Sequence, residues 1–340
     1  MRKYQFLLLV LFVFVCENIY SQNNIWKPNP DALKIVFYNV ENLFDTIDNP
    51  DVVGDEEFTP EGVKYWGTWR YNNKLIKIWK AIAAVGGRYY LPDIICFSEV
   101  ENALVLKDLL CKTPLGQGDY SFFHRESLSY RGIDVAILYK LSAVEIIDTL
   151  AIRINFDDDY HSRDILYLRC VSKISSDTVS IFANHWPSKY GGLAETERHR
   201  EKAASTLRRV VDSVFALENE PKIVCGGDFN SGVAEGRVDV YMHAEKDFSS
   251  VDLHKLYNLT SRLVGKKFSY KFHGVGEILD QVFVSGSLIN STVDIADFAF
   301  LLEPDLKYVG KKPFRTYLGY KYLGGFSDHL PVVLSIPFKK

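Results

Sequence analysis

The feature that most constrains the fold is a series of short apolar runs separated by polar turns, with few helical segments among them. Runs of about four to eight apolar residues predict strands, whereas Trp69–Val85 and Glu195–Val214 carry apolar residues at helical spacing. No regular alternation of strand and helix is present, which argues against a Rossmann fold or a TIM barrel. The pattern predicts an α/β fold in which two stacked β-sheets have helices on their outer faces.

The expected strands are distributed over almost the whole chain. They are Leu33–Tyr38, Asp93–Ser98, Val135–Tyr139, Ala143–Ile154, Ile165–Ile174, Val179–Ala183, Lys222–Gly226, Gln281–Ser285, Ile295–Phe298 and Val332–Ile336. A short helix is expected from the capping residue Asn102 to Leu110. No linker or repeat divides this series, so we expect one domain over residues 30–340.

The N-terminal residues have the composition of an export signal. Arg2 and Lys3 precede an apolar run of about ten residues that ends at Val15 and is too short to span a bilayer comfortably. We expect residues 1–21 to be removed as a secretory signal peptide, which leaves an exported protein in the periplasm or outside the cell. Lipid attachment at Cys16 is the alternative, and the size of Val15 disfavours it.

The charge balance excludes a strongly basic nucleic-acid binder. The formal net charge is −3 and becomes about −4 when Arg2, Lys3 and Glu17 leave with the signal segment. A phosphate-containing substrate would therefore need local positive charge or a bound cation. The other cysteines lack zinc-like spacing and are expected to be buried free thiols, with a disulfide as the alternative: Cys96, Cys111, Cys170 and Cys225.

Polar residues of catalytic types follow the apolar runs at several places. Because residues that follow buried strands converge on one rim of a sheet, we expect these side chains to form one site. They are Asn39, Glu99, His185, Asp228, Asn230, Asp280, Asp328 and His329.

Two of these positions suit a metal ion. Glu99 directly follows the apolar run Ile94–Phe97, and its carboxylate suits a hard cation such as Mg²⁺, which keeps waters for the substrate. Asp328 could orient a metal-bound water or bind a second cation. The neighbouring Glu101 is expected to be an ordinary solvated side chain.

The other positions suit hydrolysis at phosphorus. Asp228 can orient or deprotonate a water, and the amide of Asn230 can donate to a phosphate oxygen. His185 can donate a hydrogen bond or a proton to charge that develops in the transition state. Asp280 is the candidate that fixes the tautomer of His329 and stabilises its charged form. The remaining histidines lack such a setting and are expected at the surface: His124, His161, His199, His243, His254 and His273.

The ordered series resembles the endonuclease/exonuclease/phosphatase superfamily. The matching segments are VFYNVEN around Asn39, Glu99, NHWPS with His185, GDFN at 227–230, LDQVFVS at 279–285 and SDHLPV at 327–332. They cover roughly Leu33 to Pro337 in the order of that superfamily, which includes deoxyribonucleases, apurinic-site endonucleases, bacterial sphingomyelinases and inositol-polyphosphate phosphatases. Each motif alone is weak evidence, whereas the ordered series is strong.

The resemblance implies a four-layer α/β sandwich with two packed mixed β-sheets and a site on one rim. It also implies an enzyme that uses Mg²⁺, with Mn²⁺ or Ca²⁺ as alternatives. The cation would lie at Glu99, with Asn39 and Asp328 nearby, and Asn39 and Asn230 would bind the substrate phosphate.

The same resemblance assigns roles in the reaction. Asp228 would act on the attacking water, His185 and His329 would stabilise the phosphorane, and Asp280 would orient His329. Whether Asp228 or the Asp280–His329 pair is the general base stays open. No acid that would pair with His185 is identified in the sequence.

Positive charges near the motifs have two interpretations. Lys189, Arg198 and Arg200 either hold substrate phosphates or are solvated charges. Arg131 and Asp134 either contact substrate or form a buried ion pair.

Three functions fit the sequence. The first is an exported, monomeric nuclease that cleaves DNA or RNA, and the second is a lipid or small-molecule phosphoesterase. An apolar hairpin able to enter a membrane would favour a lipase, and none is expected, because Phe298–Leu302 is too short and reads as a strand. The third, a catalytically inactive binding protein, is disfavoured by the complete polar set.

Overall fold

The computed structural model describes residues 31–50, 52–87, 90–189 and 192–337. The predicted export segment, residues 1–21 with Cys16, lies outside them. Within the described part of the chain, no helix is long and apolar enough to cross a membrane.

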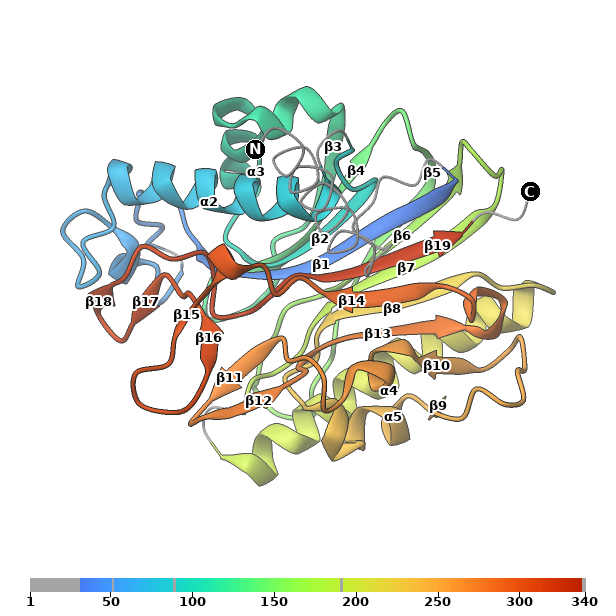
Figure 1. Cartoon of the computed structure of the whole chain (residues 1–340). Helices are drawn as coiled ribbons and strands as arrows, with labels where there is room; N and C mark the ends of the chain where they lie inside the picture. The colour runs from blue at the N-terminus through green and yellow to red at the C-terminus, as the bar shows by residue number, and fades with distance from the viewer. Residues whose placement is uncertain (1–30, 51, 88–89, 190–191, 338–340) are drawn as a thin grey trace, which may run out of the picture.

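Two mixed β-sheets form the centre of the molecule (Figure 1). The six-stranded sheet has the order β14 (Thr292–Ile295), β19 (Val332–Pro337), β1 (Ala32–Leu43), β2 (Ile94–Val100), β4 (Asp134–Lys140) and β3 (Tyr120–His124). The seven-stranded sheet has the order β5 (Val144–Ile152), β6 (Ile165–Ser172), β7 (Thr178–His185), β8 (Ile223–Asp228), β13 (Asp280–Ser285), β10 (Leu256–Asn258) and β9 (Ala244–Glu245). Each sheet has a parallel pair near its centre, β1–β2 in one and β7–β8 in the other.

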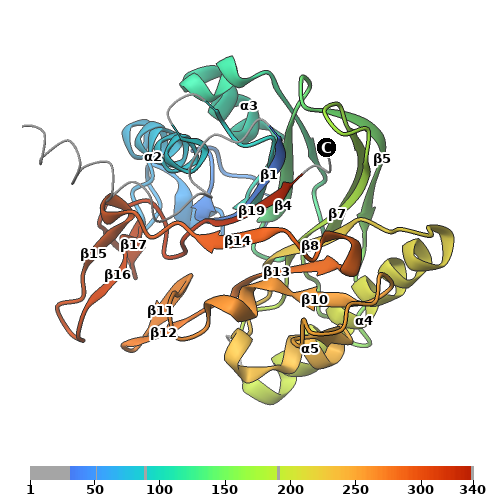
Figure 2. The same cartoon turned by 45° about the vertical axis from the view of Figure 1, so that its right-hand side comes forward.

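Helices cover the outer face of each sheet (Figure 2). Helices α2 (Thr68–Gly86) and α3 (Ala103–Lys112) lie on the six-stranded sheet, and α4 (Leu193–Leu217) and α5 (Arg237–Tyr241) lie on the seven-stranded sheet. Helix α2 buries Leu75, Ile78 and Ile82, which share one face at helical spacing. Asn102 Oδ1 accepts the N–H groups of residues 104 and 105 at 2.8 and 3.1 Å, which confirms the predicted cap of α3.

Short elements connect these layers. The 3₁₀ turns are Glu56–Phe58, Pro114–Gly118, Val233–Glu235, Leu259–Leu263, Gly286–Leu288 and Ala299–Leu301. Three small hairpins are formed by β11 (Tyr270–Phe272) with β12 (Val275–Glu277), β15 (Leu302–Pro304) with β16 (Lys311–Pro313), and β17 (Tyr317–Leu318) with β18 (Lys321–Tyr322).

The predicted α/β architecture of two mixed sheets flanked by helices is confirmed. The expected strand Ile295–Phe298 is wrong, because β14 ends at Ile295, where the N–H of Asp297 turns back to the Ile295 carbonyl. Phe298–Leu302 is likewise not a strand, since residues 299–301 form a 3₁₀ turn. The three hairpins were not predicted.

Cys96, Cys170 and Cys225 are buried free thiols as expected, whereas Cys111 is free but exposed.

The two sheets are in close contact where the ring of Phe37 on β1 lies on the backbone of Gly226 on β8. A Cβ atom at Gly226 would meet three atoms of that ring at 2.4–2.6 Å. Asn39 follows Phe37 by two residues and Asp228 follows Gly226 by two, so both lie on the same faces as this contact. The absence of a side chain at Gly226 therefore sets how near the strand ends of the two sheets can come.

Replacement of Gly226 by Ala is expected to cost about 1–3 kcal/mol of unfolding free energy, because the added methyl group overpacks the contact with Phe37. Chemical denaturation measures this loss. Gly67→Ala is the control, since a Cβ there meets no atom within 4 Å and φ is −88°. Adding Phe37→Leu should recover part of the stability of Gly226→Ala. Equal stabilities of the Gly226 and Gly67 variants would contradict this account.

Candidate active site

Strand register places three of the predicted residues side by side on the seven-stranded sheet. In the parallel pair β7–β8, His185 is the register partner of Asp228. In the antiparallel pair β8–β13, Asp228 is also the partner of Asp280. Because β7 and β8 end where β13 begins, these residues share one rim, as the sequence predicted for residues at strand ends.

The six-stranded sheet contributes Asn39 and Glu99 from the adjacent strands β1 and β2. Asn39 pairs in register with Ser98, and the register shifts at the next residue, where Glu99 has a left-handed φ of 65°. This bulge turns the Glu99 carboxylate to the rim, where its Oε2 accepts the N–H of Asn42 at 2.9 Å. Asn42 also has a left-handed φ, of 54°, so the local backbone is strained to orient this carboxylate.

One hydrogen bond joins the two sheets at the site. The Asn39 amide nitrogen donates to Asp228 Oδ2 at 3.0 Å, and both side chains are buried. The same nitrogen lies 3.4 Å from Glu99 Oε1. Asn39 therefore connects the predicted water-activating acid to the predicted metal ligand.

His329 reaches the site from the segment before β19. Its backbone N–H donates to Ser327 Oγ at 3.0 Å, and that hydroxyl donates to the carbonyl of Asn39 at 2.7 Å. The imidazole Nδ1 lies 2.7 Å from Asp280 Oδ2, and Nε2 lies 3.8 Å from Asp228 Oδ2. The pairing that the sequence suggested for His329 and Asp280 is present in the structure.

The environment of His329 favours its charged form. Burial lowers the pKa of His329, but the negative charges of Asp280 and Asp228 outweigh burial and raise the pKa well above its usual value. His329 is therefore placed as a hydrogen-bond donor toward the centre of the site.

His185 is held in the opposite state. Its Nε2 lies 3.7 Å from Asp228 Oδ2 and 3.9 Å from Glu99 Oε1, and its Nδ1 has no hydrogen-bond partner among the described residues. Burial, with the charges of Arg163 and Arg131, lowers the pKa of His185 well below its usual value. No acid is hydrogen-bonded to His185 Nδ1 within the described part of the chain, so the pairing acid that was not identified in the sequence is not found at this nitrogen.

Arg163 is a residue that the sequence analysis missed. It is 4% exposed, directly precedes the segment that enters β6, and donates from Nη2 to the carbonyl of Trp186 at 2.6 Å. Its Nε has no hydrogen-bond partner among the described residues. Its role rests on a contact with Trp186 in another segment, so no local pattern before the strand Ile165–Ser172 identifies it.

Asp228 is central to the site and almost fully buried. Burial raises the pKa of Asp228 to about 6, against the opposing effect of His329. Its Oδ1 accepts the N–H of Asn230 at 2.8 Å. The Asn230 amide donates to the carbonyl of Trp186 at 2.9 Å, so in this structure it fixes the loop beside His185, and its predicted contact with phosphate stays a prediction.

Asp328 lies at the edge of the site in a network that sequence reasoning also missed. Its Oδ2 accepts from Arg315 at 2.9 Å. Arg315 lies 3.6 Å from the buried Glu41 carboxylate, which accepts the N–H groups of Thr316 and Tyr317 at 2.5 and 3.0 Å. The metal role of Asp328 stays a prediction, since one of its oxygens is held by this arginine.

The donor set fits a hard divalent cation at Glu99. Its Oε1 has only long contacts, 3.4 Å to Asn39 Nδ2, 3.8 Å to Arg131 Nη1 and 3.9 Å to His185 Nε2, and is available to a cation. A second group, Asp228, Asp280 and His329, offers ligand atoms that all lie within 4.8 Å of one another. A cation there would compete with the hydrogen bond between Asp280 and His329.

Several further expectations can be compared with the structure. Arg131 does not pair with Asp134: it contacts Glu99 and Asn42, whereas Asp134 binds Ser127. His124 and His199 were expected at the surface, but their side chains are only 4% and 9% exposed. Glu101 is also buried, and its carboxylate accepts the N–H of Asp45 at 2.6 Å.

The basic residues after His185 differ in their surroundings, and phosphate binding by them stays a prediction. Arg200 is buried and donates to the carbonyl of Pro187, so it fixes the loop after His185. Lys189 forms an ion pair with Glu235. Arg198 is exposed on α4.

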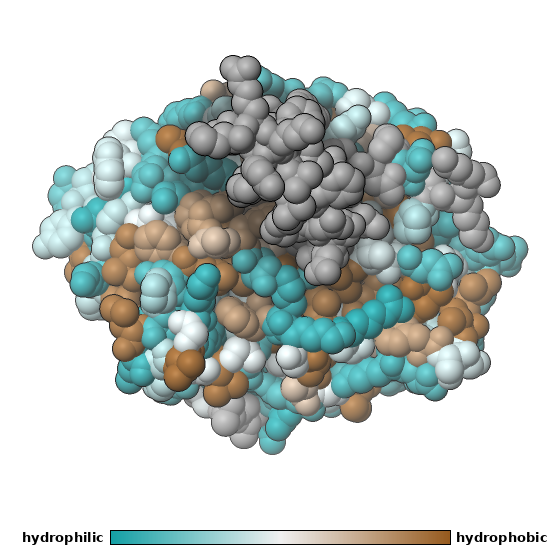
Figure 3. Space-filling view, in the orientation of Figure 1, coloured by the Kyte–Doolittle hydropathy of each residue, from teal (hydrophilic) through white to brown (hydrophobic). Residues whose placement is uncertain are grey.

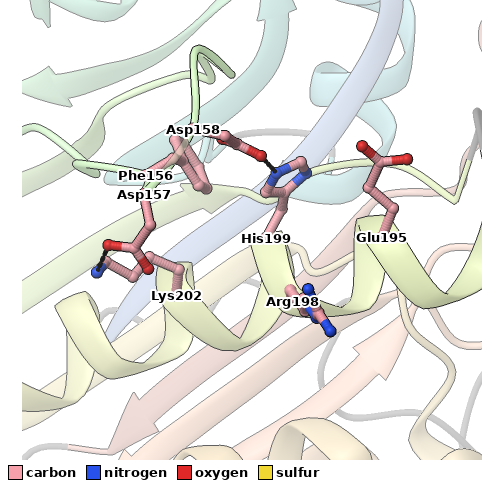
Figure 4. Close-up of a pocket in the computed structure, with 7 residues that line it drawn as sticks. All are labelled: Phe156, Asp157, Asp158, Glu195, Arg198, His199 and Lys202. Carbon is pink, nitrogen blue, oxygen red and sulfur yellow. Dashed lines mark hydrogen bonds and ion pairs between the residues drawn. The ribbon is translucent and has the colours of Figure 1, made fainter.

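Two cavities differ in their relation to the site. The larger, of about 570 Å³, lies on α4 and contains none of the predicted catalytic residues; Figure 4 shows its ion pairs Asp158–His199 and Asp157–Lys202. The smaller, of about 250 Å³, is lined by Asn42, Phe44, Val53, Gly54, Glu57, Phe58, Lys64 and Arg131. Because Asn42 and Arg131 also contact Glu99, the smaller cavity borders the site.

Comparison with known proteins agrees with this geometry. The sequence profile of the Endonuclease/Exonuclease/phosphatase family matches residues 34–337. The chain belongs to this family. No curated protein sequence matches it.

Solved structures of the family share the fold at low sequence identity. The human Nocturnin catalytic domain with bound sulfate has a TM-score of 0.54 and 16% identity, over 91% of this chain and 95% of that chain. Truncated Caenorhabditis elegans TDP2 has a TM-score of 0.54 and 14% identity, over 91% and 99%. SmcL has a TM-score of 0.56 and 15% identity, over 91% and 100%. Family enzymes are hydrolases of phosphodiester bonds and typically depend on divalent metal ions.

Asp280→Asn is expected to move the alkaline limb of the kcat/KM profile to lower pH. If His329 acts as an imidazolium, activity is present below its pKa and is lost as pH rises through it, and removal of the Asp280 charge lowers that pKa. The rate should also fall roughly 10²- to 10⁴-fold. Asp297→Asn, on the surface, is the control. A lower rate with an unmoved limb would show that Asp280 is only structural.

Glu99→Gln is expected to raise the concentration of divalent cation needed for half-maximal activity by about tenfold or more, because a charged ligand becomes neutral. The measurement is a Mg²⁺ titration of activity, supported by calorimetry of metal binding. Glu145→Gln, exposed on β5, is the matched control. An unchanged titration of Glu99→Gln would refute the ligand role.

Proposed function

We propose that this chain is an exported, divalent-metal-dependent phosphodiesterase, and in the first place a nuclease that cleaves DNA or RNA. The observation that carries the proposal is the convergence of His185, Asp228 and Glu99 from two different sheets, in which His185 Nε2 lies within 4 Å of a carboxylate oxygen of each acid. His329 and Asn39 complete the group from the same rim. A structural core has no need for so many buried polar groups at one point.

In the proposed reaction, water attacks phosphorus in line with the leaving oxygen. Asp228 orients the water and accepts its proton, which suits a carboxylate with a pKa of about 6. His329, held charged by Asp280, donates to a non-bridging oxygen of the phosphorane. A cation at Glu99, with Asn39 beside it, would supply the positive charge that polarises the phosphoryl group.

The charged state of His329 also favours one of the two candidates for the general base, which are Asp228 and the Asp280–His329 pair. A histidine whose pKa is raised well above the usual value is protonated at neutral pH and cannot accept a proton from water. Asp228 is therefore the proposed base. Neutral His185 is the proposed donor to a second phosphoryl oxygen through Nε2.

Two observations support a nucleic-acid substrate. A structure of TDP2 from D. rerio, which shares the fold at a TM-score of 0.51 and 15% identity, is described as a complex with single-strand DNA product. The cavity beside Glu99 is flanked by Lys64 and Arg131, which offer positive charge next to the proposed scissile phosphate. These two side chains place positive charge beside the site, although the net charge of the whole chain is negative.

A lipid phosphodiesterase is the second candidate, and one observation favours it. Apolar side chains are exposed at the tips of two hairpins beside His329, the feature that was not expected from the sequence. We further propose that residues 1–21 direct export and that the domain over residues 30–340 acts as a monomer.

The test is a substrate panel with purified protein. Plasmid DNA, RNA, sphingomyelin vesicles, inositol phosphates and bis-p-nitrophenyl phosphate are incubated with Mg²⁺ or with EDTA. Metal-dependent hydrolysis is expected, with a loss of roughly 10³-fold or more in His329→Ala. His254→Ala is the matched control, because His254 lies beyond the opposite end of β13 and contacts the carbonyl of Glu218. No hydrolysis of any substrate, or full activity of His329→Ala, would refute the proposal.

A further inference from the structure

Two hairpins present exposed apolar side chains at the surface. Leu306 and Val309, in the turn between β15 and β16, are each 96% exposed. Phe272 and Val275, at the tip of β11–β12, are 56% and 63% exposed. Figures 1 and 2 both show these hairpins next to each other at one edge of the molecule, and Figure 3 shows apolar side chains at the corresponding lower left. We call these four side chains the hairpin tips.

The hairpins are fixed to each other rather than independent. Lys271 Nζ forms an ion pair with Asp305 at 2.9 Å and donates to the carbonyl of Val309 at 2.8 Å. Both ionic side chains of this pair are almost buried, at 6% and 5% exposure. Gly274 packs on the ring of Tyr308, since a Cβ there would meet the ring at 2.8 Å. The apolar tips are therefore held together without being covered.

The hairpin tips lie close to the proposed catalytic histidine. Tyr270, the first residue of β11, forms a β-bridge with His329, and the two rings lie 4.8 Å apart. Since a strand advances about 3.3 Å per residue, the tip at Phe272 lies on the order of 7 Å along the chain from that bridge. A surface that binds the hairpin tips would therefore lie at the edge of the site.

The charged side chains around the hairpin tips indicate what kind of surface the tips would bind. Glu303 and Asp305 are paired with Lys312 and Lys271. Lys307 and Lys311 are exposed, and within the described residues neither has an ion-pair partner. The unpaired charge beside the apolar tips is therefore positive.

We propose that the hairpin tips insert into the surface of a bilayer that contains anionic lipids. Apolar tips rimmed by lysines match such an interface, in which the aliphatic groups leave water and the ammonium groups meet the lipid phosphates. Of the four tip side chains only Phe272 could stack on a base, whereas Leu306, Val309 and Val275 are aliphatic, so a nucleic acid fits the tips less well. The docking does not rest on the proposed function, although it would bring the site to a phosphodiester in a lipid headgroup.

The experiment is co-sedimentation with vesicles of phosphatidylcholine alone or with phosphatidylglycerol added. The protein is expected to bind the anionic vesicles, and the double variant Leu306→Asp/Val309→Asp to bind them about tenfold or more weakly. Leu217→Asp is the matched control, because Leu217 is 85% exposed at the end of α4, and its binding should equal that of the unchanged protein. Lys307→Gln/Lys311→Gln should weaken binding to anionic vesicles only.

Three outcomes would overturn the docking proposal. The first is that the unchanged protein does not bind the vesicles, and the second is that the tip variant binds them equally well. The third is a dimer in size-exclusion chromatography that only the tip variant abolishes, because the tips would then bind a second copy of the chain. Hydrolysis of soluble bis-p-nitrophenyl phosphate is measured on the same samples and should be unchanged in the tip variant. Vesicle binding therefore tests the docking proposal, and hydrolysis of the soluble substrate tests the proposed chemistry separately.

Discussion

The close packing of Phe37 on Gly226 is the contact on which the site depends. It lets two sheets approach until the amide of Asn39, from one sheet, reaches the carboxylate of Asp228, from the other, at 3.0 Å. A side chain larger than hydrogen at Gly226 would force the sheets apart or displace the ring. The strand ends, and with them the proposed metal ligand Glu99 and the proposed water-activating acid Asp228, would then separate.

The charges beside the two buried histidines make them differ. Both are almost fully enclosed, yet Asp280 and Asp228 raise the pKa of His329, whereas burial with Arg163 and Arg131 lowers that of His185. A charged donor and a neutral imidazole therefore face the same carboxylate of Asp228, at 3.8 and 3.7 Å. The division follows from the charged residues near each ring, Asp280 and Asp228 for His329 and Arg163 and Arg131 for His185.

The sequence predicted the parts of the site that depend on strand ends. Asp228, His185 and Asp280 follow or begin apolar runs, and the register places them together for that reason. Arg163 and Glu41 were not predicted, because their roles come from contacts with Trp186 and Thr316 that lie far away in the chain. The hairpins were missed for a related reason. Their strands have two or three residues each, too few for a periodic pattern to be recognised.

The central claim is that residues from both sheets act as one catalytic unit, and a double-mutant cycle tests it most directly. The kcat/KM for bis-p-nitrophenyl phosphate is measured for the unchanged protein, Asn39→Ala, Asp228→Asn and the double variant. Because the two side chains share a hydrogen bond across the sheets, the double variant should be little worse than the worse single variant. Losses that simply multiply would show that the two residues act independently and would contradict the account.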